Sequence, residues 1–158
     1  MEYFTNDSLE TKKMGERLAE KILKTERWSD KFTARDLAFV LGLEGELGGG
    51  KTTFLQGFAK GLGIKEKILS PTFVIMKRFE IENCKLKIEN FYHVDCYRIE
   101  DPQEILNLGL KDIISNSKNI VAIEWVDKIK EILPESVMTI KFEFLSEKKR
   151  KITLRDKI

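Results

Sequence analysis

The segment GELGGGKTTF, residues 45–54, constrains the fold more than any other part of this chain. Glycine destabilises a helix interior by about 1 kcal/mol relative to alanine. Even so, Gly48, Gly49 and Gly50 stand directly before a segment with helical spacing. Glycines permit backbone angles that other residues avoid, and they leave space for a close neighbour. The chain is therefore expected to curl tightly around a ligand at this point.

The segment matches the spacing of a phosphate-binding loop: Gly45, four residues, and then Gly50-Lys51-Thr52. Backbone N–H groups of such a loop surround a phosphate, and the N-terminus of the following helix adds a partial positive charge. In this pattern Lys51 reaches the β- and γ-phosphates, and the Thr52 hydroxyl binds magnesium. The alternative is an ordinary glycine-rich turn. A buried strand is predicted before the loop and a helix after it, and this context favours the nucleotide-binding loop.

Hydrophobic patterning predicts helices interleaved with buried strands, which is typical of an α/β domain. The runs LAFVLGLEG and NIVAIEW are continuously apolar, as expected of strands covered on both faces. Asp7 and Glu10 indicate the start of a helix whose buried stripe is Met14, Leu18 and Ile22. The other predicted elements are a strand at 2–5, antiparallel hairpins at 73–97 and 137–155, and a short helix from Asp101 to near Gly109. The expected fold is a P-loop NTPase-like three-layer domain, with a central mixed β-sheet and β-hairpins.

Length, composition and charge limit the possible domain organisation, location and partners of this chain. A length of 158 residues predicts a single domain covering 1–158, with 42% hydrophobic and 34% charged residues. A net charge of +2 is too small to argue for nucleic-acid binding, and the EKKRK run at 147–151 reads as a solvated turn. The N-terminus does not resemble a secretory signal, and Cys84 and Cys96 are interpreted as unpaired thiols. We therefore expect a cytoplasmic protein that is not bound to a membrane.

A magnesium site needs a carboxylate beside Thr52, and Glu124 at the end of NIVAIEW is the candidate. Ligands of open α/β sheets lie at the carboxyl ends of the strands. Glu124 should therefore lie near Thr52 if the two strands run parallel. The motifs NKxD and DxxG of GTP-binding proteins are absent from the sequence, so ATP is favoured by elimination.

Five blocks in order resemble the TsaE family, the small bacterial ATPases needed for threonylcarbamoyladenosine in tRNA. They are GELGGGKTTF, SPTF at 70–73, YHVDCYRIEDPQEILNLG at 92–109, IEW at 123–125 and the final hairpin. The resemblance covers essentially the whole chain. Three positions depart mildly from the family's common residues: Glu46 and Gly49, where Asp and Ala are usual, and Phe73, where Tyr is frequent.

The resemblance implies roles for individual residues. Thr52 and Glu124 would hold Mg²⁺, Asp95 would act near the reacting water, and Thr72 would lie in a segment that senses the γ-phosphate. Trp125 would lie near the nucleotide. The residues implied to wrap the phosphates are Gly48, Gly49, Gly50, Lys51, Thr52 and Thr53, and those implied on the adenine side are Thr11 and either Lys149 or Arg150.

Three further residues carry open alternatives. His93, the only histidine, is either a general base or a packed, hydrogen-bonded residue on the same strand face as Asp95. Arg98 is either an arginine finger supplied in cis or the partner of an acid in the following helix. Trp28, in the polar segment before the first buried strand, is either an exposed partner contact or a partly buried anchor.

The leading hypothesis for function is a partner-dependent ATPase. The resemblance implies that it regulates or resets a TsaB–TsaD heterodimer, is monomeric alone, and meets tRNA only indirectly. One alternative is a small-molecule P-loop kinase, although the seven arginines are scattered and form no basic lid. Another is a module that binds ATP without turnover.

Overall fold

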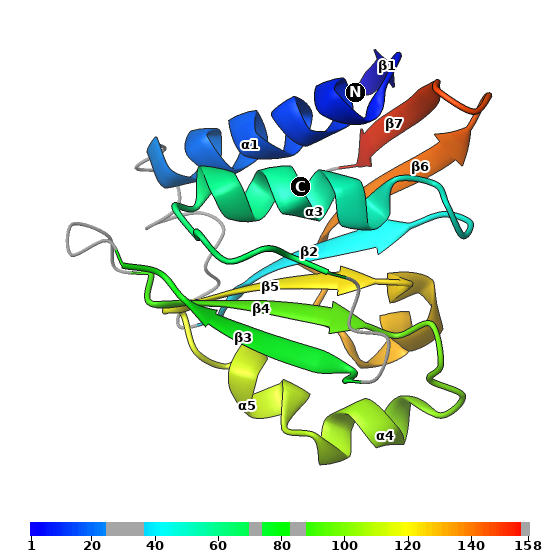
Figure 1. Ribbon diagram of the computed structural model, residues 1–158. Coiled ribbons are helices and arrows are strands. Elements are labelled where there is room, and N and C mark those ends of the chain that lie inside the picture. The colour runs from blue at the N-terminus through cyan, green and yellow to red at the C-terminus, as the bar shows by residue number, and fades with distance from the viewer. Residues whose placement is uncertain (25–36, 70–73, 83–87, 156–158) are drawn as a thin grey trace.

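The computed structural model describes residues 1–24, 37–69, 74–82 and 88–155 (Figure 1). The strands are β1 (Glu2–Thr5), β2 (Phe39–Glu44), β3 (Met76–Glu80), β4 (Asn90–Asp95), β5 (Asn119–Glu124), β6 (Met138–Phe144) and β7 (Arg150–Arg155). They form one seven-stranded sheet in the order β1-β7-β6-β2-β5-β4-β3. The predicted mixed sheet is confirmed.

The centre of the sheet is parallel and its two sides are antiparallel. β2 pairs in parallel with both β5 and β6, and β4 pairs in parallel with β5. The predicted hairpins are the antiparallel pairs β3–β4 and β6–β7, and β1 extends the sheet beyond β7. The carboxyl ends of β2, β4 and β5 therefore meet at one edge, where a site of an α/β sheet is expected.

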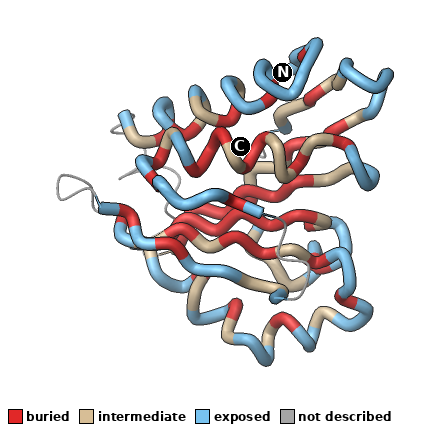
Figure 2. The backbone as a smooth tube through the Cα atoms, viewed as in Figure 1, coloured by how far each residue is buried: buried red, intermediate tan, exposed pale blue. Residues whose placement is uncertain are grey.

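Helices cover both faces of the sheet, giving three layers (Figure 1). The helices α1 (Ser8–Lys24) and α3 (Lys51–Gly61) pack on one face, with a core that includes Phe54, Phe58 and Phe91. The other face carries α4 (Pro102–Asn107), α5 (Leu110–Ile114) and the 3₁₀ segment η1 (Val126–Ile132). Figure 2 shows the buried backbone concentrated in the central strands, as the continuously apolar runs predicted.

The short elements on the second face were only partly predicted. The capping box at Asp101 and Glu104 begins α4 as expected, and Asp7 accepts a hydrogen bond from Glu10 N (2.7 Å) at the start of α1. Helix α5 follows Gly109 and was missed, as was η1. The predictions for Trp28, for Cys84 and for the β3–β4 turn fall outside the described residues. Within the described part of the chain, no helix is both long and apolar enough to cross a membrane.

The predicted buried stripe of α1 is confirmed at Ile22 but only in part at Met14 and Leu18. Thr11, Gly15, Ala19 and Ile22 are buried, whereas Met14, Leu18 and Leu23 are partly buried beside them. The reason is the close approach of α1 to α3. A Cβ on Gly15 would lie 2.2 Å from the carbonyl oxygen of Phe54. Small residues therefore line the contact, and larger apolar residues flank it.

Gly57 tests this close packing, because a Cβ there would lie 1.8 Å from the carbonyl oxygen of Lys12. Alanine normally favours a helix over glycine by about 1 kcal/mol. Here we expect Gly57→Ala to lower the free energy of unfolding by about 1–3 kcal/mol, since the two backbones must separate. Urea denaturation followed by circular dichroism measures the change. The exposed Lys13→Ala on α1 serves as control and should stay within about 0.5 kcal/mol of wild type. Equal stability of Gly57→Ala and wild type would contradict the contact.

Candidate functional site

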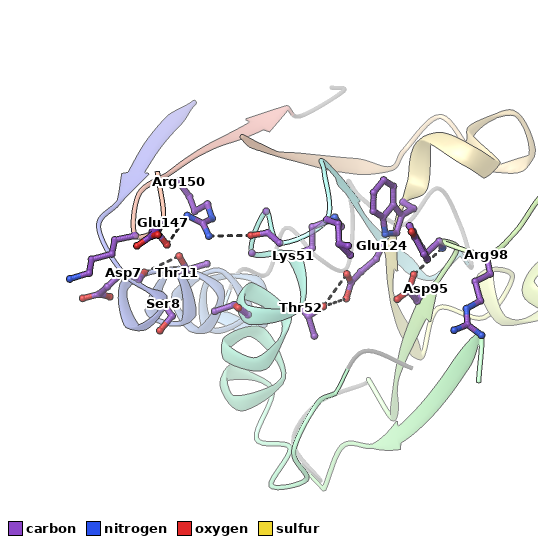
Figure 3. Close-up of a pocket in the computed structure, with 18 of the residues that line it drawn as sticks. Asp7, Ser8, Thr11, Lys51, Thr52, Asp95, Arg98, Glu124, Glu147 and Arg150 are labelled. Atoms are coloured by element: carbon purple, nitrogen blue, oxygen red, sulfur yellow. Dashed lines mark hydrogen bonds between the residues drawn. The ribbon is translucent and has the colours of Figure 1, made fainter. Parts of the chain in front are cut away.

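A cavity of about 1100 Å³ lies at the carboxyl edge of the parallel strands. The start of α1, the glycine loop, the ends of β4 and β5, and the β6–β7 turn all contribute to it (Figure 3). Thr72, a predicted switch residue, lies outside the described residues. Apart from Lys149, the alternative to Arg150, the other residues given a role by the resemblance line this one cavity: Thr11, Gly48, Gly49, Gly50, Lys51, Thr52, Thr53, Asp95, Glu124, Trp125 and Arg150.

The glycine loop leaves the centre of the cavity open. Gly48 and Gly50 have φ of 74° and 101°, in the left-handed region that glycine adopts without a steric penalty. A Cβ on Gly48 would meet no atom within 4 Å, so the space beside it is free. Gly50 is the N-cap of α3, which directs the unpaired N–H groups of the helix into the cavity. The loop and the start of the helix thus have the backbone geometry expected of an anion-binding cradle.

Lys51 is almost fully buried at the base of this cradle. Its ammonium donates hydrogen bonds to the carbonyl oxygens of Gly45 (2.7 Å) and Glu46 (2.8 Å). It also lies 4.1 Å from the centre of the Trp125 ring, within the range of a cation–π interaction. Burial lowers the pKa of Lys51, and the nearby carboxylates, Glu124 first among them, act in the opposite direction. An anionic ligand would relieve this unfavourable burial of positive charge.

Thr52 and Glu124 are in direct contact. This contact was predicted for the case in which the strand before the glycine loop runs parallel to the strand that ends at Glu124, as β2 and β5 do. The Thr52 hydroxyl lies 2.8 Å from Glu124 Oε1 and 3.1 Å from Oε2 (Figure 3). Leu43 and Glu124 are register partners in the β2–β5 pair, which sets the glycine loop beside the acid. Glu124 is 3% exposed, and the His93 Nε2 atom lies 2.9 Å from its Oε1. His93 is therefore buried and hydrogen-bonded, which is the second of its two predicted alternatives.

Asp95 stands at the end of β4, in register with Glu124 on β5. Its Oδ1 atom accepts a hydrogen bond from the backbone N–H of Tyr97 (2.9 Å). The side chain is half-buried and faces the cavity beside Thr52 and Glu124 (Figure 3). Across the described residues, no cluster of three or more acids, cysteines or histidines forms a metal site made of protein alone.

Trp125 has a strained backbone. Its φ of 59° is the one positive value found for a residue other than glycine in the described part of the chain. Such conformations cost of order 1–3 kcal/mol and concentrate at functional sites. The strained residue directly follows Glu124, and its indole contacts both Lys51 and Tyr97. The ring centres of Trp125 and Tyr97 are 5.2 Å apart.

The far end of the cavity lies between α1 and the β6–β7 turn. Arg150 donates to the Gly48 carbonyl (3.1 Å) and to the Ser146 carbonyl (2.6 Å), which ties the hairpin to the glycine loop. Arg150 lines the cavity, whereas Lys149 is exposed and does not. The buried Thr11 hydroxyl bonds with the Thr5 hydroxyl (2.9 Å) at the same end. The geometry therefore favours Arg150 over Lys149 for a contact with a bound ligand.

Several cavity residues were not predicted, because their positions depend on tertiary packing. Arg98, for which an arginine finger and an ion pair with the following helix were both considered, lines the cavity. Asp7 and Ser8 were recognised as polar residues at a helix start, and that signal could have placed them at the cavity. The unpredicted lining residues are Asn6, Asp7, Ser8, Leu47, Ile75, Tyr97, Glu104, Glu147 and Lys148.

Fold and site together define the class, an α/β domain of the P-loop NTPase type. Glu124, at the end of a neighbouring strand, contacts Thr52 on the helix that follows the glycine loop. The family profile described as "Threonylcarbamoyl adenosine biosynthesis protein TsaE" matches residues 5–152. The chain belongs to the TsaE family, as its motifs indicated.

Individual relatives agree with this placement. The chain is 41% identical to the tRNA threonylcarbamoyladenosine biosynthesis protein TsaE of Bacillus subtilis over 114 residues, or 72% of this chain and 67% of that one. It is 30% identical to the Haemophilus influenzae protein of the same name over 141 residues, or 89% of this chain and 80% of that one. The crystal structure of Bacillus subtilis YdiB superposes with a TM-score of 0.71 at 28% identity, covering 99% of this chain and 84% of that chain.

Cys96, which follows Asp95 and packs in the core of the second face, gives this part of the structure a testable pH dependence. Its thiol is buried beside Asp95, and burial raises its pKa to about 12. In a Cys84→Ser background, native Cys96 should react with iodoacetamide at pH 9 at least about 100-fold more slowly than after denaturation, because only the thiolate reacts. Mass spectrometry measures both rates, and equal rates would contradict the burial.

The same shift makes stability depend on pH in a defined direction. The folded state disfavours the thiolate, so the stabilising contribution of Cys96 is complete below the unfolded pKa of about 8.5. It is lost progressively as the pH rises toward the folded value of about 12. Unfolding midpoints of the Cys84→Ser protein between these limits should therefore fall, and they should fall less in a Cys84→Ser, Cys96→Ala variant.

Proposed function

We propose that this chain is an ATPase of tRNA threonylcarbamoyladenosine biosynthesis that binds ATP with Mg²⁺. The observation that carries the proposal is the contact of Thr52 with Glu124 beside the open glycine loop. A hydroxyl at the helix start and a carboxylate from the adjacent strand are the protein ligands that such a nucleotide site uses. Membership of the TsaE family supports the placement in this biosynthesis.

The side chains present fit a magnesium ion. Mg²⁺ prefers hard oxygen ligands, keeps several waters, and is bound by one or two carboxylates together with substrate phosphates. The Thr52 hydroxyl and the Glu124 carboxylate are such oxygens, and Asp95 lies on the next strand at the same edge. When bound, the ion would supply neutralisation of phosphate charge. Thr52 and Glu124 would hold it.

The remaining residues act on the nucleotide and on water. Lys51 exchanges its two carbonyl acceptors, on Gly45 and Glu46, for β- and γ-phosphate oxygens. Asp95 accepts a hydrogen bond from the attacking water, whose oxygen forms a bond to the γ-phosphorus. The bond from that phosphorus to the β–γ bridging oxygen breaks, the proton of the water passes to the Asp95 carboxylate and from there to solvent, and ADP and inorganic phosphate result. Phosphoryl transfer of this kind depends on positioning and charge, and it needs no covalent enzyme intermediate.

The proposed role of hydrolysis is to regulate or reset a TsaB–TsaD complex. The family resemblance supports this partner, with a monomeric chain in the cytoplasm that meets tRNA only through that complex. We expect slow hydrolysis by the chain alone, because ordering of switch segments by a partner completes many such sites. A small-molecule kinase is the competing function. Arg98 and Arg150 are the arginines that line the cavity in the described part of the chain, whereas such a kinase needs a basic lid.

Reconstitution with TsaB and TsaD tests this function directly. Purified chain, partners, tRNA and ATP should release inorganic phosphate and yield modified tRNA, and omitting the chain should reduce both. Transfer of the γ-phosphate to a nucleoside or a sugar would support the kinase instead. No stimulation of either readout by the chain would reject the proposal.

Substitutions of the two acids should separate binding from turnover. In Asp95→Asn we expect phosphate release with the partners to fall about 100-fold or more, with ATP affinity changed little, because water loses its acceptor. Glu124→Gln should lose turnover and also need more Mg²⁺ for ATP binding. Isothermal titration and phosphate release measure the two properties. Asp112→Asn, an exposed acid of α5 on the opposite face, is the matched control. Wild-type turnover in both site variants would overturn both assignments.

The two candidate basic residues of the hairpin can also be distinguished. Arg150→Ala should weaken ATP binding about tenfold, since it removes a charged donor beside Gly48. Lys149→Ala, one residue away and exposed, should change the affinity by less than about twofold. Titration of each variant with ATP measures the effect. A larger loss for Lys149→Ala would reverse the choice.

A further inference from the structure

The contact between His93 and Glu124 stands out among the buried groups that the proposed reaction does not use. His93 is the only histidine of the chain and is 0% exposed. Its Nε2 atom lies 2.9 Å from Glu124 Oε1. A buried carboxylate without hydrogen-bond donors is strongly destabilised, so a donor at this position has an energetic consequence.

Strand register explains why the contact forms. In the parallel β4–β5 pair, His93 is opposite Ala122 and Asp95 is opposite Glu124. Alternation places these four side chains on the face of the sheet covered by α3. The small Ala122 side chain leaves room for the imidazole to reach along β5 to the next residue on that face, Glu124.

The two oxygens of Glu124 have different partners. Oε1 is 2.8 Å from the Thr52 hydroxyl and 2.9 Å from His93 Nε2, whereas Oε2 is 3.1 Å from the same hydroxyl. An ionised carboxylate only accepts hydrogen bonds, so this contact requires Nε2–H as the donor. His93 Nδ1 is buried and has no hydrogen-bond partner among the described residues. Among the described residues, the hydrogen bond to Glu124 is therefore the polar contact that orients the imidazole ring. The same hydrogen bond orients the carboxylate.

We propose that His93 is a positioning residue for Glu124. Its Nε2–H fixes Oε1 and thereby the plane of the carboxylate, so that both oxygens stay within 3.1 Å of the Thr52 hydroxyl at the proposed Mg²⁺ site. This inference rests on the proposed function, because it assigns the purpose of the contact to that ion. Side chains that orient a metal ligand typically change metal affinity about 10–100-fold when replaced.

The first test needs neither metal nor nucleotide. Because the chain has one histidine, selective ¹⁵N labelling of histidine gives a spectrum that belongs to His93 alone. We expect the long-range ¹H–¹⁵N spectrum of the wild-type protein to show a protonated Nε2. A neutral ring with its proton on Nδ1 would overturn the proposal, whatever the protein's activity.

The second test uses paired substitutions. Gln places an amide nitrogen at the same bond separation from Cα as His Nε2, whereas Leu supplies no donor. His93→Leu should raise the Mg²⁺ concentration needed for half-maximal enhancement of ATP binding about 10–100-fold, and His93→Gln should restore most of it. ATP binding in EDTA should be the same in both variants as in wild type. Tyr92→Leu, on the same strand with its side chain packed against the opposite face, should leave the Mg²⁺ dependence unchanged.

The outcomes separate this inference from the proposed function. Absence of ATP binding by the wild type would reject the function, and the ¹⁵N spectrum would still decide the Nε2–H donor. Mg²⁺-dependent binding by the wild type with an unchanged profile in His93→Leu would reject the inference alone. If circular dichroism shows that His93→Leu does not fold, His93→Gln decides the question. A wild-type Mg²⁺ dependence of ATP binding in His93→Gln would support the donor role. A dependence shifted as far as that of Glu124→Gln would contradict it.

Discussion

The contact between Thr52 and Glu124 depends on one topological fact, the parallel pairing of β2 and β5, and most of the site follows from that pairing. Leu43 and Glu124 are in register, so the glycine loop leaves β2 where β5 ends. The same register extends to β4 and brings Asp95 to this edge. An antiparallel β5 would direct its carboxyl end to the opposite edge of the sheet. Three segments distant in the sequence therefore supply one set of oxygens because their strands share a direction.

A second constraint operates at the other end of the cavity. Helix α1 approaches α3 so closely that side chains at Gly15 and Gly57 would meet backbone carbonyl oxygens. The approach brings Thr11, at the start of α1, beside the glycine loop, and Arg150 contacts the loop from the hairpin. The loop is thus supported on both sides. A substitution that separates the helices would be expected to disturb the end of the cavity lined by Thr11 and Arg150 as well as the core.

The parts of this structure that sequence could predict are those governed by local chemistry. The glycine spacing and the two continuously apolar runs correctly placed the loop, β2 and β5. The five-residue α5 and the 3₁₀ segment η1 are too short to show a helical period. The stripe of α1 was predicted only in part, because Gly15 is buried where α3 approaches closely, and hydrophobic patterning does not detect a glycine contact. The contact of His93 with Glu124 required the β4–β5 register, which no pattern within either strand contains.

The arrangement bears on how nucleotide chemistry would be communicated to a partner. Glu124 is held by His93 on one side and followed by Trp125, whose positive φ brings its ring over Lys51. A ligand that draws Lys51 away from the Gly45 and Glu46 carbonyls would alter the indole's surroundings as well as the loop. Trp125 also contacts Tyr97, which is 49% exposed. The path from the glycine loop to the surface is then short, from Lys51 through Trp125 to Tyr97. Under the proposed function, a partner that contacts Tyr97 would be positioned to respond to hydrolysis.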